Sequence, residues 1–238
     1  MRHQAFTYGG NDLSPYMYVT EVTRTIAPER SIATTTVPGM DGELVGGITL
    51  DPLDIAVTAF VRRQGLSEVA EARRVLARLL VADEPARLIL PDEPDKYYLA
   101  LYKGGAELSR AAHLPSVELE FHCADPVAYG AHRTASVGTA TTAIEAGGTC
   151  RAWPTVTAKP PSGSSWTVTN VTTGDFVRVN ASFSGSQTVV LDMGLQRCTV
   201  NGADHAVSID SDFFAIDGLT QLKVSEGTAT IEWDERWL

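Results

Sequence analysis

The chain has 238 residues, of which 44% are hydrophobic and 20% charged, and its formal net charge is -10. A chain of this length can bury a hydrophobic core without disulfide bonds. Its net negative charge excludes nonspecific binding to nucleic-acid backbones, which requires clustered lysine and arginine. The sequence holds no apolar run of about 18 residues or more, so we expect no membrane insertion.

Strand signals fill the first part of the chain. β-branched residues are dense over 17–24 and 30–37, as is typical of strands. Proline and glycine at 38–42 predict a turn, after which 43–50 resumes an extended pattern. Apolar residues then alternate with other residues over 55–61, which predicts a strand with one buried face.

One helix is predicted, over residues 67–81. Its apolar residues recur at helical spacing, its acidic residues lie in the first turns, and its arginines come later, as the helix dipole favours. Strand patterns follow at 87–90, 96–103 and 117–123. Mostly antiparallel strands with one helix indicate an α+β domain.

The strand at 117–123 ends this first domain. Its apolar and polar residues alternate, and it stops at Asp125-Pro126 because proline lacks an amide donor and holds the preceding residue extended. The composition changes beyond this point, so we predict one domain over 1–130 and a second over 131–238. The residues expected at the junction are Phe121, Asp125, Pro126 and Tyr129.

Beyond Tyr129 the sequence predicts strands alone. Short alternating segments are separated by turn signals, and Asn201-Gly202 is the strongest hairpin signal of the chain. The predicted strands are 153–157, 166–171, 176–183, 188–193, 198–200, 212–214, 219–224 and 230–233. Short strands at near-regular spacing predict an all-β antiparallel sandwich.

We find no complete set of catalytic, cofactor-binding or metal-binding residues in the sequence. The Gly-x-Ser-x-Gly elbow of serine hydrolases and the spacing of zinc ligands are both missing. His122 and Cys123 are neighbours on a strand and point to opposite faces. Asp210 and Asp212 lack the glycine and terminal glutamate of a calcium loop, which favours a solvated turn. We therefore expect no enzyme activity and no cofactor.

The cysteines indicate a reducing compartment. Cys123, Cys150 and Cys198 are odd in number and far apart, which argues against a disulfide framework and favours small core residues. The N-terminal residues show no apolar segment typical of a signal peptide. We therefore expect the protein to be made and assembled in a cytoplasm.

Several short motifs, taken in their order and spacing, carry a resemblance that covers essentially the whole chain. They are Val37-Pro38-Gly39-Met40-Asp41-Gly42, the single helix over 67–81, the tyrosine strand 97–102, the segment from Glu120-Phe121-His122-Cys123 to Tyr129, and the terminal Trp233-Asp234-Glu235-Arg236-Trp237-Leu238. In these features the chain resembles the distal tail (Dit) protein family of long-tailed, non-contractile bacteriophages, the siphophages.

The resemblance implies a structural virion protein of the baseplate, at the distal end of the tail. It implies an N-terminal domain that closes into a homo-hexameric ring, and a C-terminal galectin-like sandwich. Such a ring joins the tail tube protein to the tail-tip hub or tail-associated protein and leaves a central passage for DNA, without specific nucleic-acid binding. The short turns between Trp166 and Trp233 leave no room for the inserted carbohydrate-binding modules that some members carry.

Contacts within the ring and with the tube are expected at the 37–47 loop and at the tyrosine strand, because both hold apolar or aromatic groups next to turns. The residues are Val37, Met40, Leu44, Tyr97, Tyr98 and Tyr102. One alternative is a carbohydrate-binding adhesin module at the tail tip, which predicts a tryptophan exposed on one sandwich face. A second alternative is a glycan hydrolase, which needs two carboxylates such as Glu118 and Glu120 to face one cleft.

Overall fold

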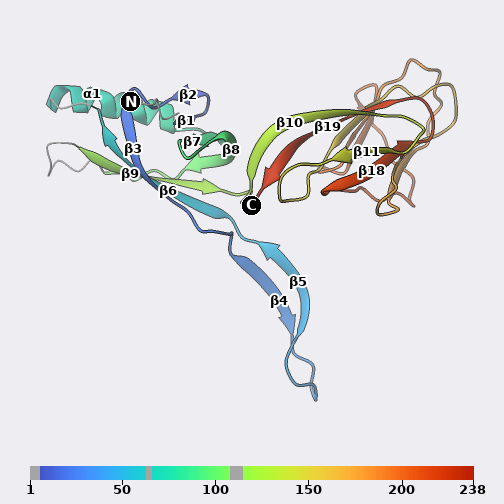
Figure 1. Ribbon diagram of the computed structural model, residues 1–238, viewed down its shortest axis with the longest axis horizontal. Coiled ribbons are helices and arrows are strands. Elements are labelled where there is room, and N and C mark those ends of the chain that lie inside the picture. The colour runs from blue at the N-terminus through green and yellow to red at the C-terminus, as the bar shows by residue number, and fades with distance from the viewer. Residues whose placement is uncertain (1–5, 63–65, 108–114) are drawn as a thin grey trace. The chain divides into compact units, whose positions relative to one another are not determined.

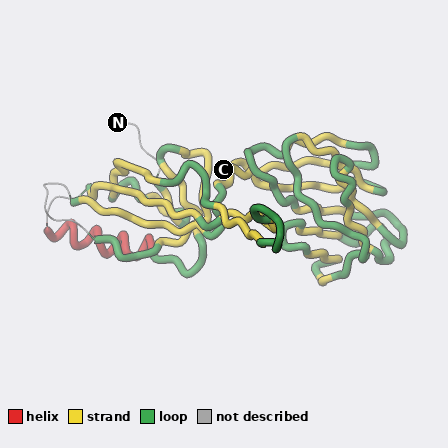
Figure 2. The backbone as a smooth tube through the Cα atoms, turned by 90° about the horizontal axis from the view of Figure 1, so that it is seen from below, coloured by secondary structure: helices red, strands yellow, loops and turns green. Residues whose placement is uncertain are grey.

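The computed structural model describes residues 6–62, 66–107 and 115–238 (Figures 1 and 2). These residues form mostly antiparallel strands with one helix, which confirms the predicted fold class. The chain splits into two compact units: unit 1 runs through Ala128 and unit 2 covers Tyr129–Trp237. The predicted boundary between domains 1–130 and 131–238 lies two residues beyond the boundary between these units, and the last residue, Leu238, groups with unit 1.

Unit 1 contains one antiparallel sheet in the order β3-β6-β9-β8-β7-β1-β2 and a separate two-stranded sheet, β4-β5. The elements are β1 (Thr7–Tyr8), β2 (Asn11–Asp12), β3 (Met17–Thr23), β4 (Arg30–Thr35), β5 (Leu44–Leu50), β6 (Leu53–Val61), α1 (Leu66–Leu80), β7 (Ala86–Leu90), β8 (Glu93–Tyr102) and β9 (Ser116–Cys123).

Alternation of side chains gives the sheet of unit 1 a buried face and a wet face. β6 and β9 pair along their lengths, and their alternate residues, such as Val57 and Leu119, are fully buried. α1 buries a stripe formed by Ala72, Leu76 and Leu80, which recur at helical spacing. Sequence periodicity of two in the strands and of 3.6 in the helix therefore supplies the apolar faces that are buried in this unit.

Aromatic side chains connect strands of unit 1 that are distant in sequence. The rings of Tyr8 and Phe121 are 5.2 Å apart, and Tyr102 lies 5.8 Å from the same phenylalanine. The Tyr8 hydroxyl donates to the carbonyl of Ala100 at 3.2 Å and accepts the amide of Tyr102 at 3.3 Å. Burial raises the pKa of Tyr8, so the hydroxyl stays a neutral donor.

Unit 2 is a sandwich of two antiparallel sheets, β11-β18-β13-β14 and β17-β16-β15-β12-β19-β10. The strands are β10 (Ala128–Val137), β11 (Thr142–Glu145), β12 (Thr155–Ala158), β13 (Trp166–Asn170), β14 (Phe176–Val179), β15 (Val189–Asp192), β16 (Arg197–Val200), β17 (Ala203–Asp204), β18 (Leu219–Val224) and β19 (Ala229–Trp237). The predicted hairpin at Asn201-Gly202 is confirmed: both residues have positive φ, and β16 pairs with β17 across them.

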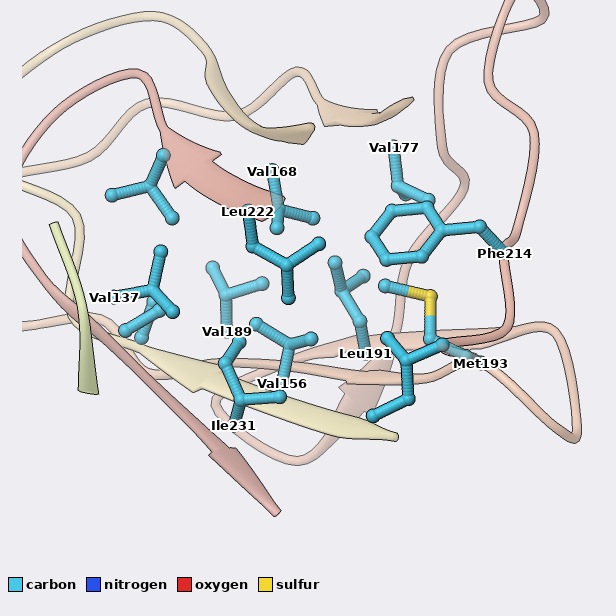
Figure 3. Packing of buried hydrophobic residues seen from close by; sticks show 14 of the residues in the cluster. Val137, Val156, Val168, Val177, Val189, Leu191, Met193, Phe214, Leu222 and Ile231 are labelled. Atoms are coloured by element: carbon cyan, nitrogen blue, oxygen red, sulfur yellow. The ribbon is translucent and has the colours of Figure 1, made fainter. Parts of the chain in front are cut away.

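Inward-facing residues of both sheets form the core of unit 2. Figure 3 shows valines and leucines from β12, β13, β15 and β18, together with Ile231 of β19, packed with Met193 and Phe214. Trp166 is 1% exposed and donates its indole N–H to the carbonyl of Glu226 at 3.0 Å. Trp233 is also buried, and its indole N–H reaches the carbonyl of Ala146 at 2.7 Å. Two of the four tryptophans thus serve the core, each with its polar atom satisfied.

Two buried thiols, one in each unit, make the stability of unit 1 and of unit 2 depend on pH. Burial, with the carboxylates of Asp54 and Asp125, raises the pKa of Cys123 from 9.0 to about 12, and burial raises the pKa of Cys198 from 9.0 to about 11. In the unfolded chain both thiols ionise near their ordinary pKa, so the folded state binds more protons above that value. The free energy of unfolding is therefore expected to fall as the pH rises above about 9.

The measurement is urea unfolding at a series of pH values, followed for unit 2 by tryptophan fluorescence, because all four tryptophans lie in that unit. Cys198→Ala is expected to flatten the alkaline decline of unit 2. An equally steep decline in this variant would show that another group causes it.

Candidate assembly surface

Strands β4 and β5 and the turn between them form an arm, residues 30–50, that is separate from the main sheet of unit 1 (Figure 1). Every residue of both strands is exposed. Among the described residues up to Ala128, seven of the ten exposed large hydrophobic side chains lie in the arm. An apolar concentration of this kind on an exposed ribbon marks an interaction surface.

The two faces of the arm differ in polarity. The register places Ile32 opposite Ile48 and Thr34 opposite Val45, and directly paired residues share a face of an antiparallel ribbon. The apolar face therefore holds Ile32, Val45, Ile48 and Leu50, which are 38 to 61% exposed. The same face also holds Arg30 and Thr34. The small face, on the other side, holds Ser31, Ala33, Gly47 and Thr49 and, at the tip end, Thr35 and Leu44. Apart from Leu44 at the tip, the large apolar side chains of the two strands thus lie on one side of the arm, which would gain more from burial than the other side.

A tight turn forms the tip of the arm. Met40 donates its amide to the carbonyl of Val37 at 3.1 Å, and Gly39, after Pro38, has a φ of 84°. Proline followed by a positive-φ glycine is the pattern of a type II turn. Three residues predicted as contacts lie here and are exposed: Val37 by 37%, Met40 by 40% and Leu44 by 52%. The structure therefore brings these three together at the end of a projecting ribbon.

Polar contacts fix the root of the arm. The Ser31 hydroxyl donates to the carboxylate of Asp51 at 2.8 Å, and the Asp51 amide donates to the carbonyl of Glu29 at 2.8 Å. These bonds join the first residues of β4 to the segment that follows β5. They hold the two strands together at the base of the arm and leave its apolar face uncovered.

The tyrosine strand is placed differently from the arm. Tyr98 is 8% exposed, lies 6.0 Å from the Arg24 guanidinium, and has its pKa raised to about 12 by burial. Tyr102 packs on Phe121 inside unit 1, and Tyr97 lies half-buried with the Arg87 guanidinium 4.4 Å from its ring. Unit 1 itself covers most of Tyr98, so the prediction of an assembly contact stays strongest for the arm.

The junction residues lie at the end of unit 1 and the start of unit 2. Phe121 is fully buried in the core of unit 1. Asp125 and Pro126 are half-buried in the segment after β9. Tyr129 opens unit 2, where the Arg236 guanidinium lies 5.6 Å from its ring.

A charged network on the wet face of β6 and β9 was missed by sequence reasoning. The register pairs Asp54 with His122, and their side chains meet at 2.8 Å, from Nδ1 to Oδ1. Lys103 Nζ lies 3.1 Å from Asp54 and 3.2 Å from Glu120. The hydrogen bond with His122, and then the contact with Lys103, lower the pKa of Asp54. Residues so far apart in sequence could be joined only once the strand register was known.

Glu118 and Glu120 do not form a glycosidase pair in this arrangement. Both side chains are exposed and line a shallow open depression together with Gly104 and Gly105. No apolar wall holds either carboxylate away from water, which a protonated catalytic acid requires. In the part of the chain that the structure describes, no three His, Cys, Asp or Glu side chains gather as they would around a metal ion. The described helix is also too short and too polar to cross a bilayer.

Comparison with known proteins connects both units to phage tails. Residues 11–123 match the family described as a phage tail protein RIFT-related domain, and residues 147–237 match the siphovirus-type tail component, C-terminal domain. The distal tail protein of Bacillus phage SPP1 is 28% identical over 241 residues, which span 97% of this chain and 94% of that protein. The chain belongs to the distal tail protein family of siphophages. Members of this family are structural components of the phage tail.

Solved structures share this fold. The crystal structure of the SPP1 Dit protein, described as a hub of the adsorption apparatus in phages that infect Gram-positive bacteria, has a TM-score of 0.85 and 24% identity, and the match covers 98% of this chain and 99% of that chain. A chain of the phage P2 baseplate in its activated conformation with calcium has a TM-score of 0.53 and 7% identity, over 94% of this chain and 92% of that one. The second similarity extends to the fold alone.

Proposed function

We propose that this tail protein is the subunit of a homo-hexameric ring that joins the tail tube to the tail-tip hub and leaves a central passage for DNA. The single observation that carries the proposal is the arm, whose apolar face has no cover among the described residues of its own chain. A heterologous contact, in which the arm of each copy covers a different surface of the next, closes into a ring when the rotation closes. The similarity to a distal tail protein over nearly the whole chain supports the same position in the virion.

The role is geometric rather than catalytic. Both carboxylates considered for hydrolysis are exposed on an open surface, and the related proteins are structural tail components. The net charge of -10 suits a passage through which DNA moves without adhering. The ring therefore needs complementary surfaces between copies, not a reactive site.

The adhesin alternative receives less support. Trp153 is 43% exposed, whereas Trp166 and Trp233 are buried in the sandwich core. Trp153 lies beside Gly194, at the turn after β15, instead of on the open face of a sheet. A single exposed indole at a turn does not make the platform on which sugar rings stack.

The mass of the purified full chain in solution, measured together with negative-stain images, tests the proposal. We expect the mass of six 25.5 kDa chains and class averages with a central hole. Addition of tail tube protein should not change the number of copies in the ring. A monomer that stays monomeric on tube ends, or a closed dimer without a hole, would contradict the proposed function.

A further inference from the structure

Two arginines on the solvent side of α1 lie outside ion-pair distance of the described carboxylates, although Glu71 precedes Arg74 by one helical turn. Arg74 and Arg78 are exposed, lie one helical turn apart, and make no ion pair with any residue that the structure describes. The helix dipole stabilises a cation in the last turn, which accounts for Arg78 alone. Like charges four residues apart repel each other across the turn. Among the other described arginines, Arg24, Arg133, Arg178 and Arg197 pair with carboxylates, whereas Arg30, Arg73, Arg87 and Arg151 do not.

The tip of the arm carries the opposite charge. Between Ser31 and Leu50 the charged residues are Asp41 and Glu43 alone. Both are exposed and pair with no described residue of their own chain. They flank Gly42, which has a φ of 86°, so the end of the ribbon carries two negative charges within three residues.

We propose that the arm tip of one copy docks on α1 of the neighbouring copy and places Asp41 and Glu43 against Arg74 and Arg78. This inference rests on the ring proposed above and names the surface that receives the arm. The apolar groups match as well: Met40 is exposed beside the acids, and Val81, directly after α1, is 70% exposed.

Charge reversal and its compensation test this contact in the full chain. Arg74→Glu with Arg78→Glu is expected to weaken ring assembly by about tenfold or more, and Asp41→Arg with Glu43→Arg to weaken it similarly. The variant that combines all four changes restores opposite charges and should assemble within about threefold of the original protein. The matched control is Lys159→Glu with Lys223→Glu, which reverses two exposed and unpaired lysines of unit 2 and should leave assembly unchanged.

The readout is the concentration dependence of the ring population, by mass photometry at two ionic strengths. The difference between the original protein and the reversals should shrink at high salt, because exposed charge pairs are screened. Two results would refute the docking site without refuting the ring: normal ring formation by both charge-reversal variants, or no recovery of ring formation in the variant that combines all four substitutions. Loss of rings in the original protein would instead refute the proposed function.

Discussion

Gly148→Ala is expected to destabilise unit 2 by about 3–5 kcal/mol. A Cβ atom at this position would lie 2.1 Å from the carbonyl oxygen of Arg236, near the end of β19. That oxygen accepts the amides of Thr149 at 2.9 Å and Cys150 at 3.0 Å. The methyl group would therefore force β19 away and lengthen both bonds, while the positive φ of 75° adds backbone strain.

Gly174→Ala is the matched control for this substitution. Gly174 has a φ of 91° in a turn of the same unit, and a Cβ there would meet nothing within 4 Å. Gly174→Ala introduces the backbone strain without the steric clash, so we expect it to lower the free energy of unfolding by about 1–2 kcal/mol. Urea unfolding followed by tryptophan fluorescence compares the two. Equal costs would show that the chain next to Arg236 relaxes freely, and that the glycine is not required by the close approach of β19.

Replacing Ile32 and Ile48 together by aspartate is expected to abolish the ring. Both side chains lie on the apolar face of the arm, where the proposed contact would bury them. Two charges introduced on each arm would lose their hydration without a partner, so we expect the dissociation constant between subunits to rise by about a hundredfold or more. The free subunit should keep its stability, because the two isoleucines are 55% and 57% exposed in it.

Ala33→Asp with Thr49→Asp adds the same charge to the small face of the same two strands. Both residues are exposed, and the register places them opposite the apolar face. We expect this variant to form rings at nearly the original concentration. Sedimentation velocity across a dilution series measures both variants. If the two variants lose the ring to the same extent, the sidedness of the arm plays no part in assembly.

Sequence periodicity predicted most of the architecture because a strand or helix that buries one face needs apolar residues at a regular spacing. The strands around Val57 and Leu119 and the helix with Leu76 each show the spacing that burial of one face demands. Asn201-Gly202 predicted its hairpin because both residues tolerate positive φ.

Other features depend on which distant residues meet, and local patterns do not contain that information. The contact of Asp54 with His122 follows from the register of β6 and β9, and the close approach of Gly148 to Arg236 follows from the path of β19. The arm is an intermediate case. Its strands and turn were predictable from 30–50, but their complete exposure was not, because the same apolar residues would suit a buried hairpin.

The position of this chain in intact tails is the most direct test of the account. Cryo-electron microscopy of virions, with the density assigned from the fold of both units, should show six copies in one ring where the tube ends and the tip begins. The arm of each copy should lie on its neighbour. Tails that are complete without this protein, or density that places it along the tube or on the capsid, would contradict the account.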